Sequence, residues 1–413
     1  MITKEEFEKL AGIRLIEVDD KLVYNDNLDL WGRKDITELP DNLKVLGYLQ
    51  LNMSGVTKLP KGLEVERWLS ISWTYIEELP EDIKLGGNLY MDSMDKSFSF
   101  PKILKIDGEL LCTDNIIKRM PEELYVKKTC YFSESTFDKS PKVMEICGSL
   151  VLRSTPITEL PKGLKEVYGS LDIYNTYVTK LNENLVVYSH FVLGYTQIEE
   201  LSKGLIVGGT LNLRCINLKD YSNLHKVCSE LVVSKEKYNE IKDTLAKHSK
   251  ELIWSDELIV TFEPNYNGAY LFENEIGRYI KVDWYFGKIV EQKGNVYHIK
   301  TYYSDSIIYL VTDGEGHWSY GDTLGEAKAD LLYNIIDRDK DFYKDLTLDS
   351  ELSFVDAIVC YRVITGIYPI AIKEFIKNKL NNNMKDSYTI KEFIELTKGE
   401  YRDKVFREFF CKD

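Results

Sequence analysis

The 413-residue chain has few of the residues and spacings on which common enzyme sites depend. Its five histidines show neither an H-x-x-x-H nor an H-E-x-x-H spacing. Catalytic zinc sites use such spacings because they place two ligands on one face of a helix. The sequence also lacks G-x-S-x-G and G-x-x-x-x-G-K-[ST], the patterns of a nucleophile elbow and of a phosphate-binding loop. We therefore expect no enzyme activity, no metal and no cofactor.

Disulfide frameworks and membrane spans are missing as well. The seven cysteines form no C-x-x-C pair, and their odd number leaves no closed set of disulfides. No stretch approaches the roughly 18 apolar residues of a membrane-spanning helix. The first twenty residues, MITKEEFEKLAGIRLIEVDD, carry acidic residues where a signal peptide has a positive flank. We expect free thiols, no membrane contact and a cytoplasmic protein.

Basic residues are in deficit. The chain has 53 Lys and Arg against 67 Asp and Glu, which gives a formal net charge of −14. Proteins that bind DNA or RNA generically carry a basic surplus, so no such partner is expected. The length exceeds what one hydrophobic core usually supports, and this predicts either two domains or a repeat array.

What the sequence does contain is a repeat. An apolar-x-apolar triplet recurs every 20 or 21 residues, starting at Leu28, Leu49, Leu69, Leu89, Leu110, Cys130, Leu150, Leu171, Phe191, Leu211 and Leu231. Seven of the ten prolines follow a triplet start by eleven or twelve residues, namely Pro40, Pro60, Pro80, Pro101, Pro121, Pro141 and Pro161. A period of this length predicts a stacked solenoid, in which each coil buries its apolar edge against its neighbours.

The units share the template L-x-L-x-x-[TS]-x-I-x-x-L-P-x-x-L-x-V-x-G-x. Alternation over the first three residues predicts a short strand with its two aliphatic side chains inward and the middle residue outward. The later Ile or Val should fill the layer between coils, and the Thr or Ser at the sixth place should bond to the backbone of the corner. Glycines just before the next strand should permit a tight turn, at Gly47, Gly87, Gly108, Gly148, Gly169 and Gly209.

This pattern resembles the short bacterial leucine-rich repeat with its Leu-Pro step, over residues 28 to about 235. The resemblance implies an α/β solenoid with parallel strands on one face. We expect residues 1–27 to form an N-terminal cap and residues 28–250 the solenoid with its C-terminal cap, because a solenoid needs covered ends. The units from Leu89 to Met144 depart from the template, with SFSFP, KRMP and DKSP in place of ELP.

Residues 251–413 predict a separate α+β domain. Up to Tyr320 the segment is rich in β-branched and aromatic residues and punctuated by Asn-Gly, Lys-Gly-Asn and Asp-Gly, which predicts antiparallel hairpins. Helical patterns follow in TLGEAKADLLYNIIDRD, SFVDAIVCYRVITG, IAIKEFIKNKL and TIKEFIELTKG. Arg362, near the end of the second of these helices, is expected to form a structural ion pair or a helix cap.

The segments GHWSYGDTLGEAKADLLYNI, LSFVDAIVCYRVITG and YTIKEFIELTKGEY, followed by FREFF, resemble the C-terminal domain common in uncharacterised phage and prophage proteins. In that family this domain often follows leucine-rich repeats, and the match covers roughly residues 260–410. The family pattern has an Ala-Cys pair after Thr-Gly and a Gly-Gln-Tyr-Gly turn, whereas this chain has Ile367-Tyr368 and Gly399-Glu400-Tyr401-Arg402. The resemblance implies a mobile-element origin and the cytoplasm of a bacterial host cell.

The outward positions of the predicted strands carry many aromatic and arginine side chains. These types supply most of the binding energy at protein interfaces, because they bury a large area for few immobilised torsions. The residues expected to bind a protein partner are Tyr48, Trp68, Trp73, Tyr90, Tyr131, Arg153, Tyr174, Tyr195 and Arg214. Together with the phage resemblance, this implies a host protein as the partner, such as a component of antiviral defence, which the chain would inhibit.

Two other functions stay open on the sequence. A pocket lined by aromatics and arginines could hold a small anionic nucleotide signal, and the protein would then act as a sponge. His317, beside Asp313, Glu315 and Asp322, could act as a general base or metal ligand of a hydrolase in the C-terminal domain. The structural alternative for this segment is a turn that leads into the helix starting at Thr323. The pattern sets no oligomeric state.

Overall fold

The computed structural model describes residues 2–137, 139–221, 223–245, 249–254, 257–262, 264–301, 306–336, 339–380 and 385–411. The chain forms two compact units. The first consists of Met1–Glu263 with Phe272–Gly277, and the second of Pro264–Leu271 with Arg278–Asp413.

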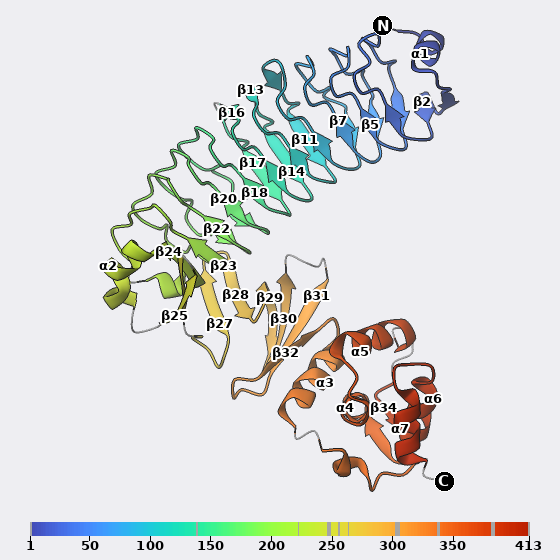
Figure 1. The fold of residues 1–413 in the computed structure, drawn as a ribbon, viewed down its shortest axis with the longest axis vertical. Coiled ribbons are helices and arrows are strands. Elements are labelled where there is room, and N and C mark those ends of the chain that lie inside the picture. The colour runs from blue at the N-terminus through green and yellow to red at the C-terminus, as the bar shows by residue number, and fades with distance from the viewer. Residues whose placement is uncertain are drawn as a thin grey trace. The chain divides into compact units, whose positions relative to one another are not determined.

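The first unit is a parallel β-solenoid (Figure 1). Each predicted triplet begins a short strand, and successive strands pair in parallel with the triplet starts in register, for example Leu49 with Leu69 and Leu150 with Leu171. The strands of this sheet are β3 (Leu28–Asp29), β5 (Leu49–Gln50), β7 (Leu69–Ser70), β9 (Leu89–Tyr90), β12 (Leu110–Leu111), β15 (Cys130–Tyr131), β18 (Leu150–Val151), β20 (Leu171–Asp172), β22 (Phe191–Val192), β23 (Ile206–Asn212) and β24 (Cys228–Ser234). The predicted solenoid, with a parallel strand at each triplet, is confirmed.

A second parallel sheet runs along the coils, just before the corner that leads to each strand of the first. It arises from the L-x-V part of the template, as in Leu43-Lys44-Val45, where alternation buries both aliphatic side chains. Its strands are β2 (Lys21–Tyr24), β4 (Leu43–Val45), β6 (Glu64–Val65), β8 (Lys84–Leu85), β11 (Ile103–Ile106), β14 (Glu123–Val126) and β17 (Val143–Ile146). The later strands β19 (Glu166–Val167) and β21 (Val186–Val187) continue this position and join the first sheet through β23.

The units that depart from the template form a third sheet. Strands β10 (Phe98–Ser99), β13 (Ile116–Arg119) and β16 (Thr136–Phe137) pair in parallel immediately before or near the prolines of these coils. Figure 1 shows β13 and β16 on the side of the coils opposite to β11 and β14. Phe98 and Phe100 are fully buried there, and Phe100 takes the place of the Leu of the ELP step.

The layer between the coils is filled as the template predicts. The inward residues of the triplets are buried, and so are the later aliphatics, with Ile36, Val56 and Val178 at 0% exposure. The sixth-place residues form the predicted ladder. Thr74, Thr155 and Thr176 each donate through Oγ1 to the carbonyl oxygen three residues earlier, over 2.6, 2.7 and 2.9 Å.

The corner glycines are required for a reason other than their turn conformation. Gly47, Gly87 and Gly148 have no positive φ. A Cβ added at Gly87 would instead lie 1.7 Å from the carbonyl oxygen of Arg67 in the preceding coil. The glycines are therefore needed because the backbones of successive coils approach too closely at this corner to leave room for a side chain.

Both ends of the solenoid are covered. Helix α1 (Lys4–Ala11) starts with a capping box at Thr3, and β1 (Ile16–Val18) pairs antiparallel with β2. At the other end, η1 (Leu224–Lys226) and β24 lead into α2 (Lys235–Leu245), the predicted polar helix.

One strand assignment from the sequence is wrong. Residues 257–262 were predicted to belong to the C-terminal sheet. They form β26 (Glu257–Phe262), which pairs antiparallel with β24 and with β25 (Ser249–Trp254) and so extends the solenoid sheet. The alternating ELIVTF pattern specifies a strand but not its partner, and the open edge of β24 supplies one.

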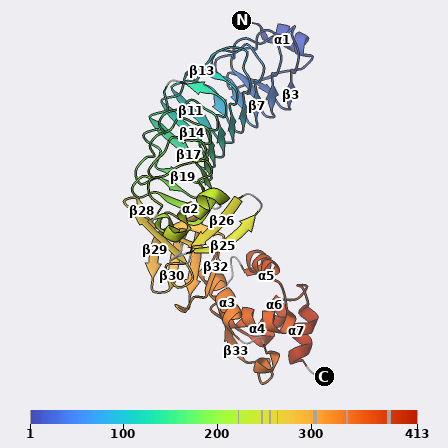
Figure 2. The same cartoon turned by 60° about the vertical axis from the view of Figure 1, so that its left-hand side comes forward.

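The six-stranded sheet between residues 270 and 321 is an antiparallel meander, as predicted. Its strands pair in sequence order and are β27 (Tyr270–Asn274), β28 (Gly277–Val282), β29 (Tyr285–Lys293), β30 (Val296–Thr301), β31 (Ile307–Thr312) and β32 (Trp318–Gly321). The Lys-Gly-Asn signal lies at the β29–β30 turn, where Gly294 has a φ of 55°. Figure 2 shows this sheet followed by the helices.

The predicted helices are all present in the second unit, together with short elements between them. Thr323 and Ser353 cap the first two of these helices as predicted, and Gly366 ends the second in a left-handed conformation. The elements are α3 (Leu324–Ile335), η2 (Lys340–Tyr343), β33 (Glu351–Ser353), α4 (Phe354–Thr365), α5 (Pro369–Phe375), η3 (Ile376–Leu380), β34 (Ser387–Thr389), α6 (Ile390–Leu396) and α7 (Asp403–Phe410). No helix among the described residues is long and apolar enough to cross a membrane.

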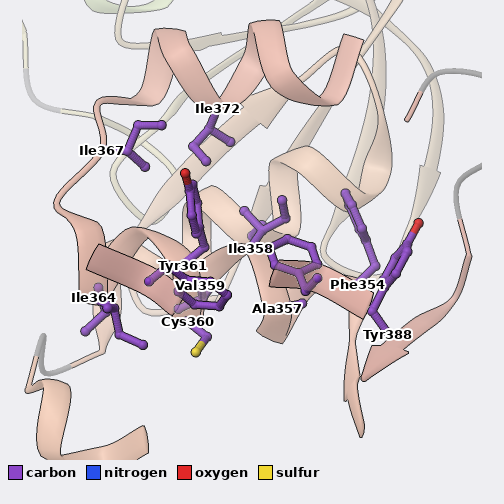
Figure 3. Packing of buried hydrophobic residues seen from close by; sticks show 14 of the residues in the cluster. Phe354, Ala357, Ile358, Val359, Cys360, Tyr361, Ile364, Ile367, Ile372 and Tyr388 are labelled. Carbon is purple, nitrogen blue, oxygen red and sulfur yellow. The ribbon is translucent and has the colours of Figure 1, made fainter. Parts of the chain in front are cut away.

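Helix α4 forms the centre of the second unit's core (Figure 3). It is buried on nearly all sides, and its Tyr361 ring packs edge-on against Phe406 and Phe393, with ring centroids 5.0 and 6.1 Å apart. Figure 3 shows side chains from α4 meeting Ile372 of α5 and Tyr388 of β34. Many elements distant in sequence therefore depend on one helix.

The predicted structural role of Arg362 is confirmed. Its side chain is 1% exposed, pairs with Asp330 of α3 and lies over the Tyr333 ring at 3.8 Å. A second buried carboxylate on α3, Glu326, is 3.1 Å from Lys373 of α5. These pairs hold α3 against α4 and α5.

Candidate functional site

The outward side of the first sheet, together with the turn after each strand, is here called the strand face. Because the triplets are in register, residues at the same place in successive units form columns along it, one strand spacing apart. The places on this face are the residue before each strand, the second strand residue, and the two residues that follow the inward apolar side chain. All nine predicted partner-binding residues lie at these places.

Three of the predicted residues form an aromatic group at β5, β7 and β9. Tyr48 and Trp68 stack with ring centroids 4.1 Å apart and planes 8° from parallel. Trp68 meets Tyr90 edge-on at 5.9 Å, and the Tyr90 hydroxyl accepts a 2.6 Å hydrogen bond from Asn88. The three half-buried rings form a preorganised apolar surface over three coils.

A second group lies at β18, β20 and β22. The Arg153 guanidinium is 4.8 Å from the centre of the Tyr174 ring and donates to Asp172 Oδ2 through Nε at 3.1 Å and Nη2 at 2.9 Å. Tyr174 in turn meets Tyr195 edge-on at 5.2 Å. A hydrogen bond with Cys215 raises the pKa of Tyr195, while the charge of Arg214 opposes that rise, so Arg214 belongs to the same neighbourhood.

The other two predicted residues are placed separately. Tyr131 lies half-buried on β15, in a coil between the two groups. Trp73 follows β7 in the same coil as Trp68 and is 47% exposed. The structure thus brings six of the nine residues into two groups, sets Arg214 beside the second, and leaves Tyr131 and Trp73 at points of their own.

The turn after each strand places one residue in the left-handed region. This residue is four places after the triplet start in ten successive coils, and its φ lies between 49° and 68° at Gly32, Met53, Trp73, Ser93, Asp114, Glu134, Ser154, Asn175, Tyr195 and Cys215. The coil stacking imposes the conformation, because the amide at this place donates to the next coil, as Ser93 N does to Thr113 O at 3.0 Å.

Large apolar side chains are out of place in this column. The left-handed conformation costs an L-residue roughly 1–2 kcal/mol, and only Gly, Asn and Asp adopt it routinely. Gly32, Asp114 and Asn175 follow that rule, whereas Met53, Trp73 and Tyr195 do not. These last three are also exposed, by 42%, 47% and 55%, so burial of apolar area does not compensate fully for the strain.

Acidic residues are absent from the predicted partner-binding set but share the columns of the strand face. Asp92 lies on the strand face in the coil of Tyr90, and Glu109, Asp114 and Glu134 lie on it in the next two coils, before the second aromatic group. Their spacing from each strand start, the same as that of the aromatics, was the signal that could have identified them. Met53 could have been found in the same way, at the position equivalent to Trp73.

The histidine proposed for a hydrolase site lies in a turn. His317 Nδ1 is 2.5 Å from Asp313 Oδ2, and Asp313 Oδ1 accepts from the backbone amides of Glu315 and His317 at 2.8 and 3.1 Å. These bonds lower the pKa of Asp313, that to the Glu315 amide most of all. Within the part of the chain that the structure describes, no three His, Cys, Asp or Glu side chains gather as metal ligands would.

The fold and the site together define a class of protein: a parallel β-solenoid with an aromatic strand face, followed by an α+β region. Compared with protein-family models, with curated proteins and with solved structures, the chain shows no match.

Proposed function

We propose that the chain is a non-enzymatic binding protein whose strand face holds a protein partner. The observation that carries the proposal is the exposure of Met53, Trp73 and Tyr195 at strained left-handed positions. Strain of this kind lowers the stability of the free protein and persists at sites that serve function. Other coils fill the same place with Gly32, Asp114 or Asn175 at less cost, so the large side chains have no role in folding that smaller ones could not fill.

The two aromatic groups also favour a binding role for the strand face. Tyrosine, tryptophan and arginine are the residues that most often dominate binding at interfaces, and here they are held rigid by stacking and by the Arg153–Asp172 pair. Rigid side chains lose little entropy on binding, so more of the contact energy is expressed as affinity. The β-solenoid extends this arrangement over many coils, which suits a protein surface better than a small ligand.

The resemblance to phage and prophage proteins adds a finer proposal. The partner is a protein of the bacterial host, and the chain inhibits it in the cytoplasm. A component of antiviral defence is the class of partner that the resemblance implies.

Site-specific crosslinking followed by affinity measurement tests the proposal. A photoreactive amino acid at Trp73 should crosslink one host protein that the same group at Tyr125, on β14 of the second sheet, does not capture. With that protein purified, Trp68→Ala/Trp73→Ala should weaken binding by at least about 100-fold, since two central aromatic residues are removed.

The matched control is Lys105→Ala/Tyr125→Ala. In this pair the Lys105 ammonium lies 5.4 Å from the centre of the Tyr125 ring in the next coil, as Arg153 lies over Tyr174 on the strand face, but Lys105 and Tyr125 are on the second sheet. It should bind the partner as the wild type does. Equal affinity of the Trp68/Trp73 variant and the wild type would mean that the strand face is not the binding surface.

A further inference from the structure

The pairing of acidic side chains differs between the strand face and the second sheet of the solenoid. Outside the strand face, several acids are paired with a lysine about one coil away. Examples are Lys84 with Glu64 at 2.7 Å, Lys127 with Asp107 at 2.8 Å and Lys142 with Glu122 at 2.7 Å. Such pairs across neighbouring coils offset the repulsion that a column of like charges would create.

On the strand face this compensation is missing over several coils. Asp92, Glu109, Asp114 and Glu134 form no ion pair within the residues that the structure describes. From the coil of Tyr48 to that of Tyr131, the strand-face places hold no Lys or Arg. Asp114 and Glu134 even occupy the same place in adjacent coils, one strand spacing of roughly 4.8 Å apart along the column.

The carboxylates are also held in position. Asp92 Oδ1 accepts from the Thr113 amide at 3.0 Å and from its hydroxyl at 2.6 Å, and Asp114 accepts from the Ser93 hydroxyl at 2.9 Å. Fixed like charges next to one another weaken the free solenoid. A partner that carries cations would relieve this repulsion, as lysines of the next coil do elsewhere.

Asp92 lies in the coil of Tyr90 and the other three acids lie in the two coils that follow, before the Tyr174–Tyr195 group. A partner that covers both aromatic groups must therefore cover the acids as well. A partner with acidic side chains there would be repelled, and one with neutral side chains would bury the carboxylates without a counter-charge. Charge complementarity therefore decides what kind of surface fits.

We infer that the strand face recognises a protein segment rich in lysine or arginine, whose cations contact Asp92, Asp114 and Glu134 while its apolar side chains lie on the aromatic groups. This inference rests on the proposed function, because it names the chemistry of the partner that the same face binds. Arginine suits the site well, since its planar group can both pair with carboxylates and stack on aromatic rings.

Selection from a displayed library of random peptides on the full chain tests the inference. Enriched peptides should carry a surplus of Lys and Arg over Asp and Glu. For a synthetic copy of the best peptide, Asp114→Asn/Glu134→Gln should raise the Kd about tenfold at low salt, and the difference should shrink at high salt as screening grows.

The matched control is Asp107→Asn/Glu122→Gln. It changes the net charge by the same amount in neighbouring coils, but on acids that are already paired with lysines. Its Kd should equal that of the wild type. Equal weakening by both double variants would reflect net charge alone and overturn the inference.

The remaining outcomes separate this inference from the proposed function. If binding is lost in Trp68→Ala/Trp73→Ala but unchanged in Asp114→Asn/Glu134→Gln, the strand face binds a partner, and the inference that this partner is a basic segment is wrong. If the tryptophan variant binds as the wild type does, both fail. Enrichment of neutral or acidic peptides, or of none, overturns the inference, and so does sedimentation showing that the face pairs two copies of this chain.

Discussion

The two units of this protein bury their cores in different ways. In the solenoid successive coils repeat the same backbone pairing with the coil before and after them, as Leu49 pairs with Leu69 and Leu69 with Leu89. In the second unit one helix, α4, contacts several helices and strands at once, and charged groups such as Arg362 are buried with it. The first arrangement spreads stability along the chain, whereas the second concentrates it.

This difference explains why a strained or charged binding surface can lie on the solenoid. A solenoid coil tolerates strain or repulsion locally, because neighbouring coils still supply their own contacts. Trp73 and the unpaired acids lie in such coils. In the second unit the buried Arg362 is paired with Asp330. Without such a pair, a single buried charge would weaken the whole core.

The largest effect should follow from breaking the charge pair in the second unit. Arg362→Ala leaves the largely buried Asp330 carboxylate without its ion-pair partner, which should lower the free energy of unfolding by about 3–5 kcal/mol. Hydrogen exchange should report lost protection throughout α3, α4 and α5. Lys328→Ala, an exposed change on α3, serves as the control, and protection lost only within one turn of Arg362 would contradict the concentrated core.

A smaller effect should follow from breaking the coil stacking. Gly87→Ala places a methyl group 1.7 Å from the Arg67 carbonyl oxygen, and separating the coils should cost about 2–3 kcal/mol in denaturant unfolding. Exchange protection should fall at β7 and β9 and stay unchanged several coils away. Gly12→Ala, where nothing lies within 4 Å of the added Cβ, should show only the cost of its left-handed conformation, and a loss spread over all coils would refute local stacking.

The paired acids of the second sheet should contribute less again. The hydrogen bond with Lys84, together with the charge and hydrogen bond of Lys21, lowers the pKa of Glu64 below its ordinary value of 4.5, against the opposing effect of burial. Its contribution to stability is therefore present above pH 4.5 and is lost as the pH falls through the lowered pKa.

Glu64→Gln should cost about 1 kcal/mol at pH 7, and the difference from the wild type should vanish in acid. Unfolding in denaturant at several pH values measures this. Glu109→Gln, on the strand face, should leave the unfolding free energy unchanged at pH 7. A loss at Glu109 equal to that at Glu64 would contradict the contrast between the two sheets.

Sequence reasoning succeeded where structure depends on neighbours in the repeat. The triplet period specified β5, β7 and β20 and their register, because every coil must bury the same two side chains. It placed the glycines at the corners but did not explain why they are needed there, since the close approach of Gly87 to Arg67 involves two backbones that no single-unit pattern describes. The partner of β26 was missed for a related reason, because alternation does not say which open edge a strand will join.

The candidate site was predictable in part. The outward places of the strands identified the two aromatic groups, since register brings equivalent residues together. The strain at Met53, Trp73 and Tyr195 could not be foreseen, because it depends on a left-handed turn that the template does not reveal through glycine. The missing counter-charges of Asp114 and Glu134 also became visible only when the lysines of the other sheet were seen paired with their own acids.

The most direct test of the binding role is to measure Trp73→Asn in two ways. Asparagine tolerates the left-handed conformation, so the free energy of unfolding should stay the same or rise by up to about 1 kcal/mol. Affinity for the partner captured by crosslinking should fall at least about tenfold, because an exposed aromatic anchor is removed. A variant that is clearly less stable than the wild type yet binds the partner equally well would contradict the account.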